Sequence, residues 1–405
     1  MLGWANRFNI FLFLDHNHYP QPATYGFEWV LAVAGEHGFI QSIDQTKNLQ
    51  HPGWLFGHLS YELKEDLHGL FAYKTNRVGF PRIFFFSPSI IIFFKNDELQ
   101  VEAEDPDLIF DAINSFDSFS LPSSAVQFTA RLSREEYINK IQKLQQHIQR
   151  GDCYEINFCQ EFYAEGIIDP VKVFLDLSKI SPNPFAAFYK LNEQFLICAS
   201  PERFLRKHQN RLITQPIKGT APRDLKDAGT DEKLKKELRE SAKEQSENVM
   251  IVDLMRNDLS MVCKPSTVIV DELFGIYSFP QVHQMISTVS GELKEGVDLY
   301  SILKSTFPMG SMTGAPKRRV MELVDEFEDQ QRGIFSGSVG YIDPEGNFDF
   351  NVVIRSIMYN ARDNYISYQV GSGITFYSDP EKEWEECILK AEAIKKVLNI
   401  SDQHL

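Results

Sequence analysis

The chain has 405 residues, of which 43% are hydrophobic and 24% charged, and its formal net charge is −15. At about 150 residues per domain, this predicts two or three globular domains, or one large fold, and excludes disorder of the whole chain. The negative charge argues against a nucleic-acid-binding surface, which needs clustered positive charge. The sequence contains no run of about 18 apolar residues, so no membrane span is predicted. Neither nucleic acid nor a membrane is therefore an expected partner.

The N-terminal region, residues 1–125, is predicted to be rich in strands. Apolar and aromatic segments with turn-forming residues at or near their ends predict strands at 9–14, 27–33, 53–63, 81–86 and 90–94. Residues 104–127 hold four Asp and five Ser, which indicates a domain boundary. A second and larger region is expected over residues 126–405.

Helices and strands are mixed in this second region. Ser133-x-x-Glu136 is a capping box that predicts a helix ending at Gly151. Another helix is predicted over 231–254, and a last one begins with Asp379 as N-cap and Pro380 in the first position. Strands are predicted at 153–162, 185–189, 195–199, 211–215, 267–270, 338–342, 348–359 and 365–370. Because strands and helices do not alternate strictly, we expect an α+β fold with large mixed or antiparallel sheets packed with helices.

The cysteines are odd in number and form no C-x-x-C pair. They are Cys153, Cys159, Cys198, Cys263 and Cys387. This predicts free, buried thiols in a reducing compartment, without disulfides or a zinc cluster. The first residues lack a basic region followed by a long apolar one, so no signal peptide is expected and the predicted location is the cytoplasm.

Two of the predicted helices carry the same pair of carboxylates, Glu244 with Glu247 and Glu383 with Glu386. A spacing of three places both members of a pair on one helical face, where like charges repel unless water or a cation screens them. If the two faces meet, four carboxylates offer the oxygen ligands that Mg²⁺ prefers. The alternative is two ordinary solvated helix faces. Lys390 lies one turn beyond Glu386 and is expected to pair with it or to reach an anionic ligand.

Three further features suit a small anion. Gly371-Ser372-Gly373 follows a predicted strand, and its amide groups are expected to form an anion-binding nest. Residues 307–317 contain two glycines and two hydroxyls before a helix, although their spacing is not that of a P-loop. Arg355 lies in a predicted apolar strand and needs an anionic partner, either a substrate carboxylate or a protein carboxylate.

Two titratable residues are candidates for catalysis. Lys218 lies between apolar and turn residues, where a lowered pKa would make its amine a nucleophile or base. Glu202 follows an apolar strand, where a carboxylic acid can donate a proton. The alternative for both is a structural ion pair.

Together these segments resemble the chorismate-utilising enzymes. This family includes component I of anthranilate synthase, component I of aminodeoxychorismate synthase, isochorismate synthase and salicylate synthase. The resemblance covers about residues 130–400, with a weaker likeness at 54–57 and 60–64. The blocks that carry it are 151–157, 200–204, 216–220, 247–258, 307–317, 337–341, 370–374 and 379–391. It implies that family's fold and a chorismate-binding catalytic region over residues 126–405.

The resemblance also implies roles for individual residues. Glu244, Glu247, Glu383 and Glu386 would hold Mg²⁺, which polarises the ring carboxylate of chorismate. Glu202 would be the general acid that assists loss of the C4 hydroxyl. The implied substrate-binding residues are Arg355, Lys390, Ser372 and Gly373 at the enolpyruvyl carboxylate, His283 near the ring, and Thr313 and Gly314 along the pocket. For His283 the alternative is a satisfied core histidine.

Two positions distinguish reactions within the family. Isochorismate and salicylate synthases have a water-activating Lys where this chain has Glu155, which disfavours water as the nucleophile. Anthranilate synthases usually read P-I-A-G-T over 216–220, whereas this chain has Lys218, like the aminodeoxychorismate synthases. In that branch the Lys is implicated in attack at ring C2, before ammonia displaces it. Glu155 also replaces a frequent Gln, and it adds negative charge unless it is protonated or paired.

The resemblance therefore implies formation of 4-amino-4-deoxychorismate from chorismate and ammonia, on the route to 4-aminobenzoate and folate. Because no G-x-C-x-G-type glutaminase site is present, a glutamine amidotransferase partner is implied as the source of ammonia. The alternatives are anthranilate synthase component I and a non-catalytic chorismate-binding subunit. Ala221 and Met261 replace residues that are often Arg in the family, which removes positive charge near the expected pocket.

Overall fold

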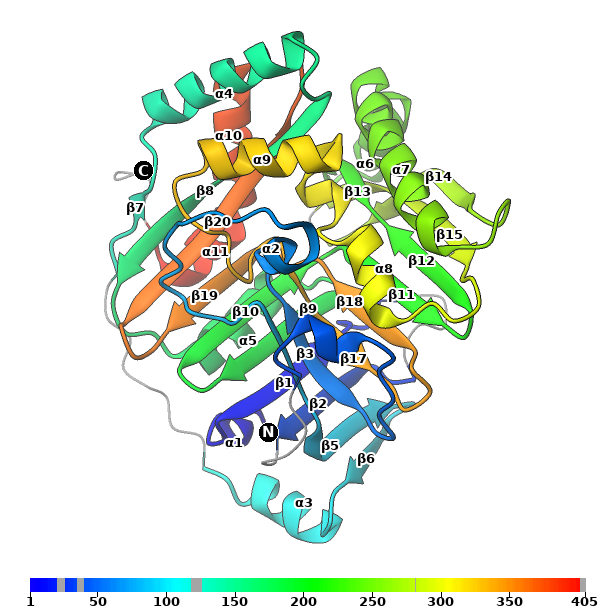
Figure 1. Ribbon diagram of the computed structural model, residues 1–405. Helices are drawn as coiled ribbons and strands as arrows, with labels where there is room; N and C mark the ends of the chain where they lie inside the picture. Colours follow the sequence, from blue (N-terminus) through cyan, green and yellow to red (C-terminus); the bar gives the residue numbers. More distant parts are fainter. Residues whose placement is uncertain (20–25, 35–39, 118–125, 281, 401–405) are drawn as a thin grey trace.

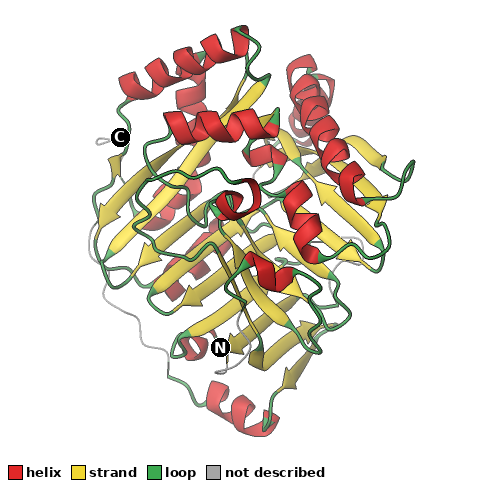
Figure 2. Ribbon diagram, in the orientation of Figure 1, coloured by secondary structure: helices red, strands yellow, loops and turns green. Residues whose placement is uncertain are grey.

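The computed structural model describes residues 1–19, 26–34, 40–117, 126–280 and 282–400. Within these ranges two large sheets form the centre, and the paired strands of both run antiparallel. Helices surround the sheets (Figure 2). The predicted α+β class is confirmed.

The first sheet has eleven strands in the described residues. Their order is β16 (Gly314–Ala315), β8 (Glu155–Glu165), β20 (Tyr365–Ile374), β19 (Ser356–Asn360), β10 (Gln194–Ser200), β9 (Phe185–Leu191), β1 (Ile10–Asp15), β2 (Trp29–Ala34), β5 (Pro88–Lys95) and β6 (Glu98–Glu102), with β7 (Thr129–Ala130) beside β8.

The second sheet has nine strands in the same ranges. Their order is β13 (Ile217–Pro222), β15 (Val282–Glu292), β12 (Arg211–Gln215), β11 (Arg203–His208), β18 (Phe348–Asn351), β17 (Ser338–Ile342), β3 (Leu55–Leu59) and β4 (Ile83–Phe86), with β14 (Ile269–Ser278) beside β15.

The helices vary in length from one turn to six. They are α1 (Leu2–Ala5), α2 (Leu63–His68), α3 (Pro106–Asn114), α4 (Arg134–Gln149), α5 (Pro170–Ile180), α6 (Ala228–Glu240), α7 (Ala242–Val262), α8 (Leu299–Thr306), α9 (Lys317–Phe327), α10 (Pro380–Lys390) and α11 (Glu392–Leu398), with the 3₁₀ turns η1 (Ile43–Thr46) and η2 (Gly310–Met312). The capping box of Ser133 and Glu136 and the cap by Asp379 form as predicted.

Strands from both predicted regions share both sheets. β1 pairs with β9, and β3 pairs with β17. The predicted boundary at residue 125 falls at the end of 118–125, which lies outside the described residues. The N-terminal strands therefore continue the sheets of the second region.

Alternation along the strands produces two hydrophobic cores, because successive side chains point to opposite faces of a sheet. Leu12 of β1 lies with Phe56 of β3 in the core between the sheets. Its neighbours Phe11 and Phe13 lie in the second core, which the first sheet shares with α4, α5, α10 and α11.

All five cysteines are buried and free, as predicted. None of the described helices is both long and apolar enough to cross a bilayer.

Two of the predicted elements are each divided in the structure. The helix predicted over 231–254 is two helices, because Ser241 takes extended backbone angles and its side chain caps α7 through the amide of Glu244. The strand predicted over 348–359 is β18 and β19, which belong to different sheets. The chain crosses between the sheets at Val352–Arg355, where Arg355 has a φ of 52°.

Three other strands end at residues that differ from the prediction. The strand predicted at 53–63 ends at Leu59, because a turn from Ser60 starts α2. The strand predicted at 267–270 runs on to Ser278, and the one at 365–370 runs on to Ile374.

Candidate active site

Helices α7 and α10 carry the two glutamate pairs, and both helices lie in the upper part of Figure 1. Each helix begins with a capping side chain, Ser241 for α7 and Asp379 for α10. Glu244 and Glu383 consequently lie in first turns, where the helix dipole favours negative charge.

The charges of all four glutamates act on Lys243. Glu383 is buried, and the other three are half-buried. Burial raises the pKa of Glu247 to about 7, and it raises the pKa of Glu244, with a further increase from the charge of Glu386. Burial would lower the pKa of Lys243, but the charges of all four glutamates raise it. The charges of all four carboxylates therefore converge on one neighbouring ammonium group, that of Lys243.

Two ammonium groups supply positive charge at this place. Lys243 Nζ lies 3.8 Å from an oxygen of Glu247, and Lys390 Nζ lies 2.7 Å from an oxygen of Glu386. Lys390 also donates to the carbonyl of Gly371 at 2.9 Å, so it pairs with Glu386, one of its two predicted roles. Across the described ranges no three His, Cys, Asp or Glu side chains converge as a formed metal site. The donor set nevertheless has the oxygen chemistry that a hard dication takes.

A largely buried ion pair joins β13 to β8. Lys218 Nζ donates to Glu155 Oε1, and the two side chains are 10% and 1% exposed. Burial alone would lower the pKa of Lys218, but the charges of Glu155 and Glu247 and the hydrogen bond raise it. The prediction of a lowered pKa is therefore wrong, because acidic neighbours outweigh burial. Lys218 is an ammonium group in this state.

Two glycines allow the backbone to enclose this pair. A Cβ at Gly373 would lie 2.6 Å from Glu155 Oε1 and 2.8 Å from Lys218 Nζ, and a Cβ at Gly314 would lie 2.1 Å from the Glu155 carbonyl oxygen. Gly314 therefore needs a residue without a side chain, whereas a side chain at Gly373 would displace the ends of the ion pair.

The predicted amide nest at Gly371-Ser372-Gly373 does not form. These residues continue β20 and pair with Cys159, Phe158 and Asn157 of β8. An antiparallel ladder uses their backbone groups in place of a turn. Ser372 is buried, and Gly373 borders the Lys218–Glu155 pair.

Glu202 lies between β10 and β11 and is 4% exposed. Burial raises its pKa to about 7, against the opposing effects of a hydrogen bond from Ser311 and the charge of Lys218. A carboxyl group with this pKa is protonated in good part at neutral pH and can act as a general acid.

Arg355 brings a guanidinium group close to Glu202. It lies at the crossover between β18 and β19, so its predicted place inside a strand is wrong. Its left-handed backbone is uncommon for a residue with a side chain and is typical of functional sites. Burial lowers its pKa, while the charge of Glu202 raises it. Arg355 is half-buried and supplies positive charge for an anionic ligand.

His283 is hydrogen-bonded at both ring nitrogens. It lies on β15 opposite Ala221 of β13. Ser278 Oγ is 2.8 Å from Nδ1, and Asp231 Oδ1 is 3.0 Å from Nε2. This geometry corresponds to the satisfied buried histidine that the sequence left open as an alternative.

Met261, at the far end of α7, is exposed.

Thr313 is fully buried in the loop before β16. Its hydroxyl donates to the Met309 carbonyl at 3.0 Å, and its own carbonyl accepts from the amide of Asn157 at 2.7 Å. Thr313 therefore fixes the loop against β8, and Gly314 follows directly.

A buried ion pair that sequence reasoning missed supports this loop. Arg332 pairs with Glu328 at 2.6 Å and donates to the carbonyls of Met312 and Asn157 at 2.6 and 2.8 Å. Glu328 also accepts from the amide of Cys159 at 2.8 Å. No helical spacing in the sequence predicts this pair, because Arg332 lies beyond the end of α9.

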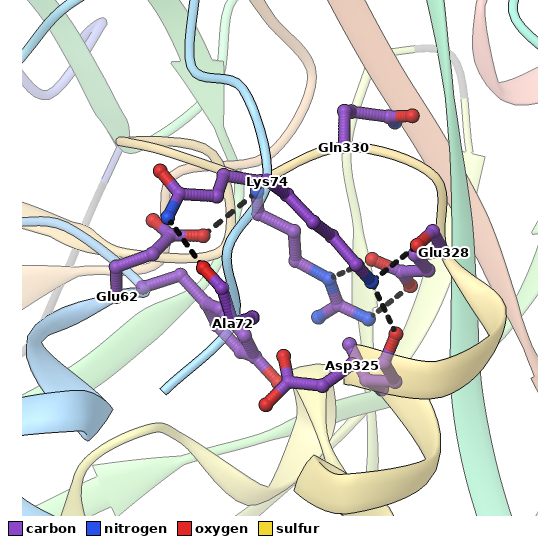
Figure 3. Close-up of a pocket in the computed structure, with 10 residues that line it drawn as sticks. Glu62, Ala72, Lys74, Asp325, Glu328 and Gln330 are labelled. Carbon is purple, nitrogen blue, oxygen red and sulfur yellow. Dashed lines mark hydrogen bonds and ion pairs between the residues drawn. The ribbon is translucent and has the colours of Figure 1, made fainter. Parts of the chain in front are cut away.

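Two polar cavities lie beside Arg332. The smaller has a volume of about 10 Å³, near the minimum for one water molecule. Figure 3 shows Lys74 reaching across it to the carbonyl of Glu328. The larger, about 170 Å³, is also lined by Arg131 and Glu161. Neither is lined by a predicted site residue.

Comparisons with known proteins identify the family of the chain. Residues 27–396 match the family described as chorismate binding enzyme. Aminodeoxychorismate synthase component 1 of Escherichia coli (strain K12) is 39% identical over 282 residues, which are 70% of this chain and 61% of that protein. An anthranilate synthase component I-like protein of Synechocystis sp. is 35% identical over 375 residues, 88% of this chain and 76% of that protein.

Among solved structures, anthranilate synthase component I from Streptococcus pneumoniae TIGR4 has the same fold. The superposition of the two chains has a TM-score of 0.78 and covers 96% of this chain and 92% of that chain, and their sequences are 23% identical. The matched segment spans less than two thirds of the Escherichia coli relative.

Proposed function

Since the chain belongs to the family of chorismate binding enzymes, we propose that it forms 4-amino-4-deoxychorismate from chorismate and ammonia. The observation that carries this proposal is the enclosed Lys218, held by Glu155, with Glu202 as a buried acid whose charge acts on it. A relative named aminodeoxychorismate synthase component 1 at 39% identity supports it. The product would serve 4-aminobenzoate and folate synthesis.

The proposed site binds the chorismate dianion through cations and a metal. Arg355 and Lys390 would hold the enolpyruvyl carboxylate, with Ser372 and Gly373 beneath it and Thr313, Gly314 and His283 around the pocket. Glu244, Glu247, Glu383 and Glu386 would hold Mg²⁺. When bound, the metal would neutralise the ring carboxylate and withdraw electron density from the ring.

The chain's own residues would then move protons and form bonds. The Lys218 amine attacks ring C2, the two conjugated ring double bonds each shift by one position, and the C4–O bond breaks. Glu202 gives its proton to the departing hydroxyl, which leaves as water. Ammonia attacks C4, the C2–N bond to Lys218 breaks, and Glu202 takes back a proton from the new amine.

A glutamine amidotransferase is the proposed source of ammonia. The name component 1 of the relatives implies a second component. Free ammonia is expected to substitute for it. We further propose a cytoplasmic location, supported by five free cysteines.

Product analysis tests the proposed function. The purified chain is incubated with chorismate, Mg²⁺ and ammonium at mildly alkaline pH, and the products are identified by mass spectrometry. We expect an amine that retains the enolpyruvyl group. Anthranilate with pyruvate would show that Lys218 does not decide the reaction, and chorismate binding without turnover would favour a binding subunit.

A further inference from the structure

Lys218 must lose a proton before its nitrogen can attack carbon. An ammonium group has no free electron pair, and in this structure Lys218 is charged and bound to Glu155. The proposed chemistry therefore needs a proton acceptor within reach of Nζ.

The acidic groups that face Lys218 come from three other elements. Glu155 lies on β8, Glu202 between β10 and β11, and Glu247 on α7. Glu202 is already protonated in good part, and its proton is needed at the leaving hydroxyl. Glu247 belongs to the proposed metal site. Glu155 is the group with a hydrogen bond to Nζ itself.

The second oxygen of Glu155 is free to take part. Oε2 is buried and has no hydrogen-bond partner in the described structure. A buried carboxylate oxygen without a donor is costly to keep charged. Transfer of a proton from Lys218 removes both charges of the pair from the protein interior. No side chain stands at Gly373 to keep the pair apart.

We propose that Glu155 is a catalytic residue that takes the proton from Lys218 and later returns it. This inference rests on the proposed function. As the Lys218–C2 bond forms, Glu155 accepts a proton from Nζ and becomes a neutral acid. When ammonia displaces Lys218, the C2–N bond breaks and Glu155 gives the proton back. The pair regains its starting state, and the net reaction consumes chorismate and ammonia and releases water.

The pH dependence of Glu155→Gln tests this role. In the wild type the pair keeps its shared proton, so kcat at saturating chorismate and Mg²⁺ is flat between about pH 5.5 and 7. In the variant Lys218 must lose its proton to water, so kcat falls by about 10²-fold or more at pH 6 and recovers about tenfold per pH unit. A loss by the same factor at every pH would overturn the proposal.

A carboxylate from solution gives a second test. In Glu155→Ala the space of the side chain is open, and added formate is expected to restore part of the activity. The control is Glu165→Gln, which lies exposed at the other end of β8 and should keep wild-type activity. Formate that stimulates neither variant, although Glu155→Ala is folded and binds chorismate, would contradict the proposal.

Chemical labelling of Lys218 separates failure of this inference from failure of the proposed function. Acetylation of the substrate-free protein, read by peptide mass spectrometry, should be faster at Lys218 in Glu155→Gln than in the wild type. The reason is that loss of the negative charge lowers the pKa of the amine. If Lys218 is acetylated faster in Glu155→Gln but the wild type forms no amine product, Glu155 does pair with Lys218 and the proposed function is wrong. If product forms and Glu155→Gln keeps a flat profile, Glu155 is not the base.

Discussion

In the proposed reaction, Lys218 and Glu202 need opposite protonation states. The amine must lose a proton and the acid must hold one, although both side chains are enclosed. The surroundings meet only the second demand: burial raises the pKa of Glu202, whereas the acids around Lys218 raise its pKa and hold the proton on the amine.

Replacing Lys218 should remove the chemistry and leave binding intact. Lys218→Ala should lower amine-product formation by about a thousandfold or more, the scale seen for loss of a nucleophile. Lys218→Arg keeps the positive charge beside Glu155 but is not a nucleophile, so it should be equally inactive. Calorimetric titration checks that both variants bind chorismate. Activity in Lys218→Arg would mean that only the charge matters.

Glu202 should control the alkaline side of the pH profile. Its pKa is raised to about 7, so the proton-donating form is complete at lower pH and is lost as pH rises through 7. In the wild type kcat/KM should fall about tenfold per unit above that pH. Glu202→Gln should lower kcat/KM by about 10²- to 10⁴-fold and remove this decline. A wild-type slope in the variant would assign the titration to another group.

Gly373 should be required for the geometry of the pair. In Gly373→Ala the new methyl group meets the flexible ends of Lys218 and Glu155, so they move and the fold persists. We expect kcat to fall at least about tenfold, because small displacements of reacting groups are costly. The control is Gly229→Ala at the start of α6, where the nearest atom lies at 3.4 Å. Equal activity of both variants would show that the pair tolerates displacement.

At the scale of elements, the two capped helices α7 and α10 place the glutamates. The sequence predicted α10 correctly because Asp379 and Pro380 form a strong local signal. It missed the break at Ser241, since a serine inside a charged segment is also compatible with one continuous helix. It missed the crossover at Arg355 because apolar residues stand on both sides of it, at 352–354 and 357–359, with no Gly or Pro between them.

The proposed metal role of α10 can be tested with two neighbouring glutamates. Glu386→Gln should raise the Mg²⁺ concentration for half-maximal activity by at least about tenfold, since even outer-shell losses cost that much. Glu385→Gln is the matched control, because Glu385 is exposed on the same helix. An unchanged Mg²⁺ requirement in Glu386→Gln would exclude this residue from the metal shell.

At the scale of the whole molecule, the site depends on contacts between distant parts of the chain. Glu155 and Lys218 are 63 residues apart, and Arg332 reaches back 175 residues to Asn157. The residue types and motifs were visible in the sequence, but no local pattern predicts such partners. The shared sheets likewise depend on long-range pairing, as between β1 and β9.

Arg332 should therefore contribute to stability as well as to the site. Arg332→Met leaves Glu328 buried without its charge partner, which should lower the free energy of unfolding by about 3–5 kcal/mol. Urea unfolding followed by circular dichroism measures this change. Arg318→Met, which removes an exposed pair on α9, should change it by about 1 kcal/mol or less. Similar decreases in the free energy of unfolding for both variants would show that the buried pair does not hold the loop.

Trapping a covalent adduct on Lys218 tests the central claim most directly. The protein is mixed with chorismate and Mg²⁺ without ammonia, quenched, and examined by intact-protein and peptide mass spectrometry. We predict an adduct on Lys218 with the mass of chorismate less one water, which disappears on addition of ammonium and never forms in Lys218→Arg. Turnover to the amine product with no adduct at any time in the wild type would contradict nucleophilic attack by Lys218.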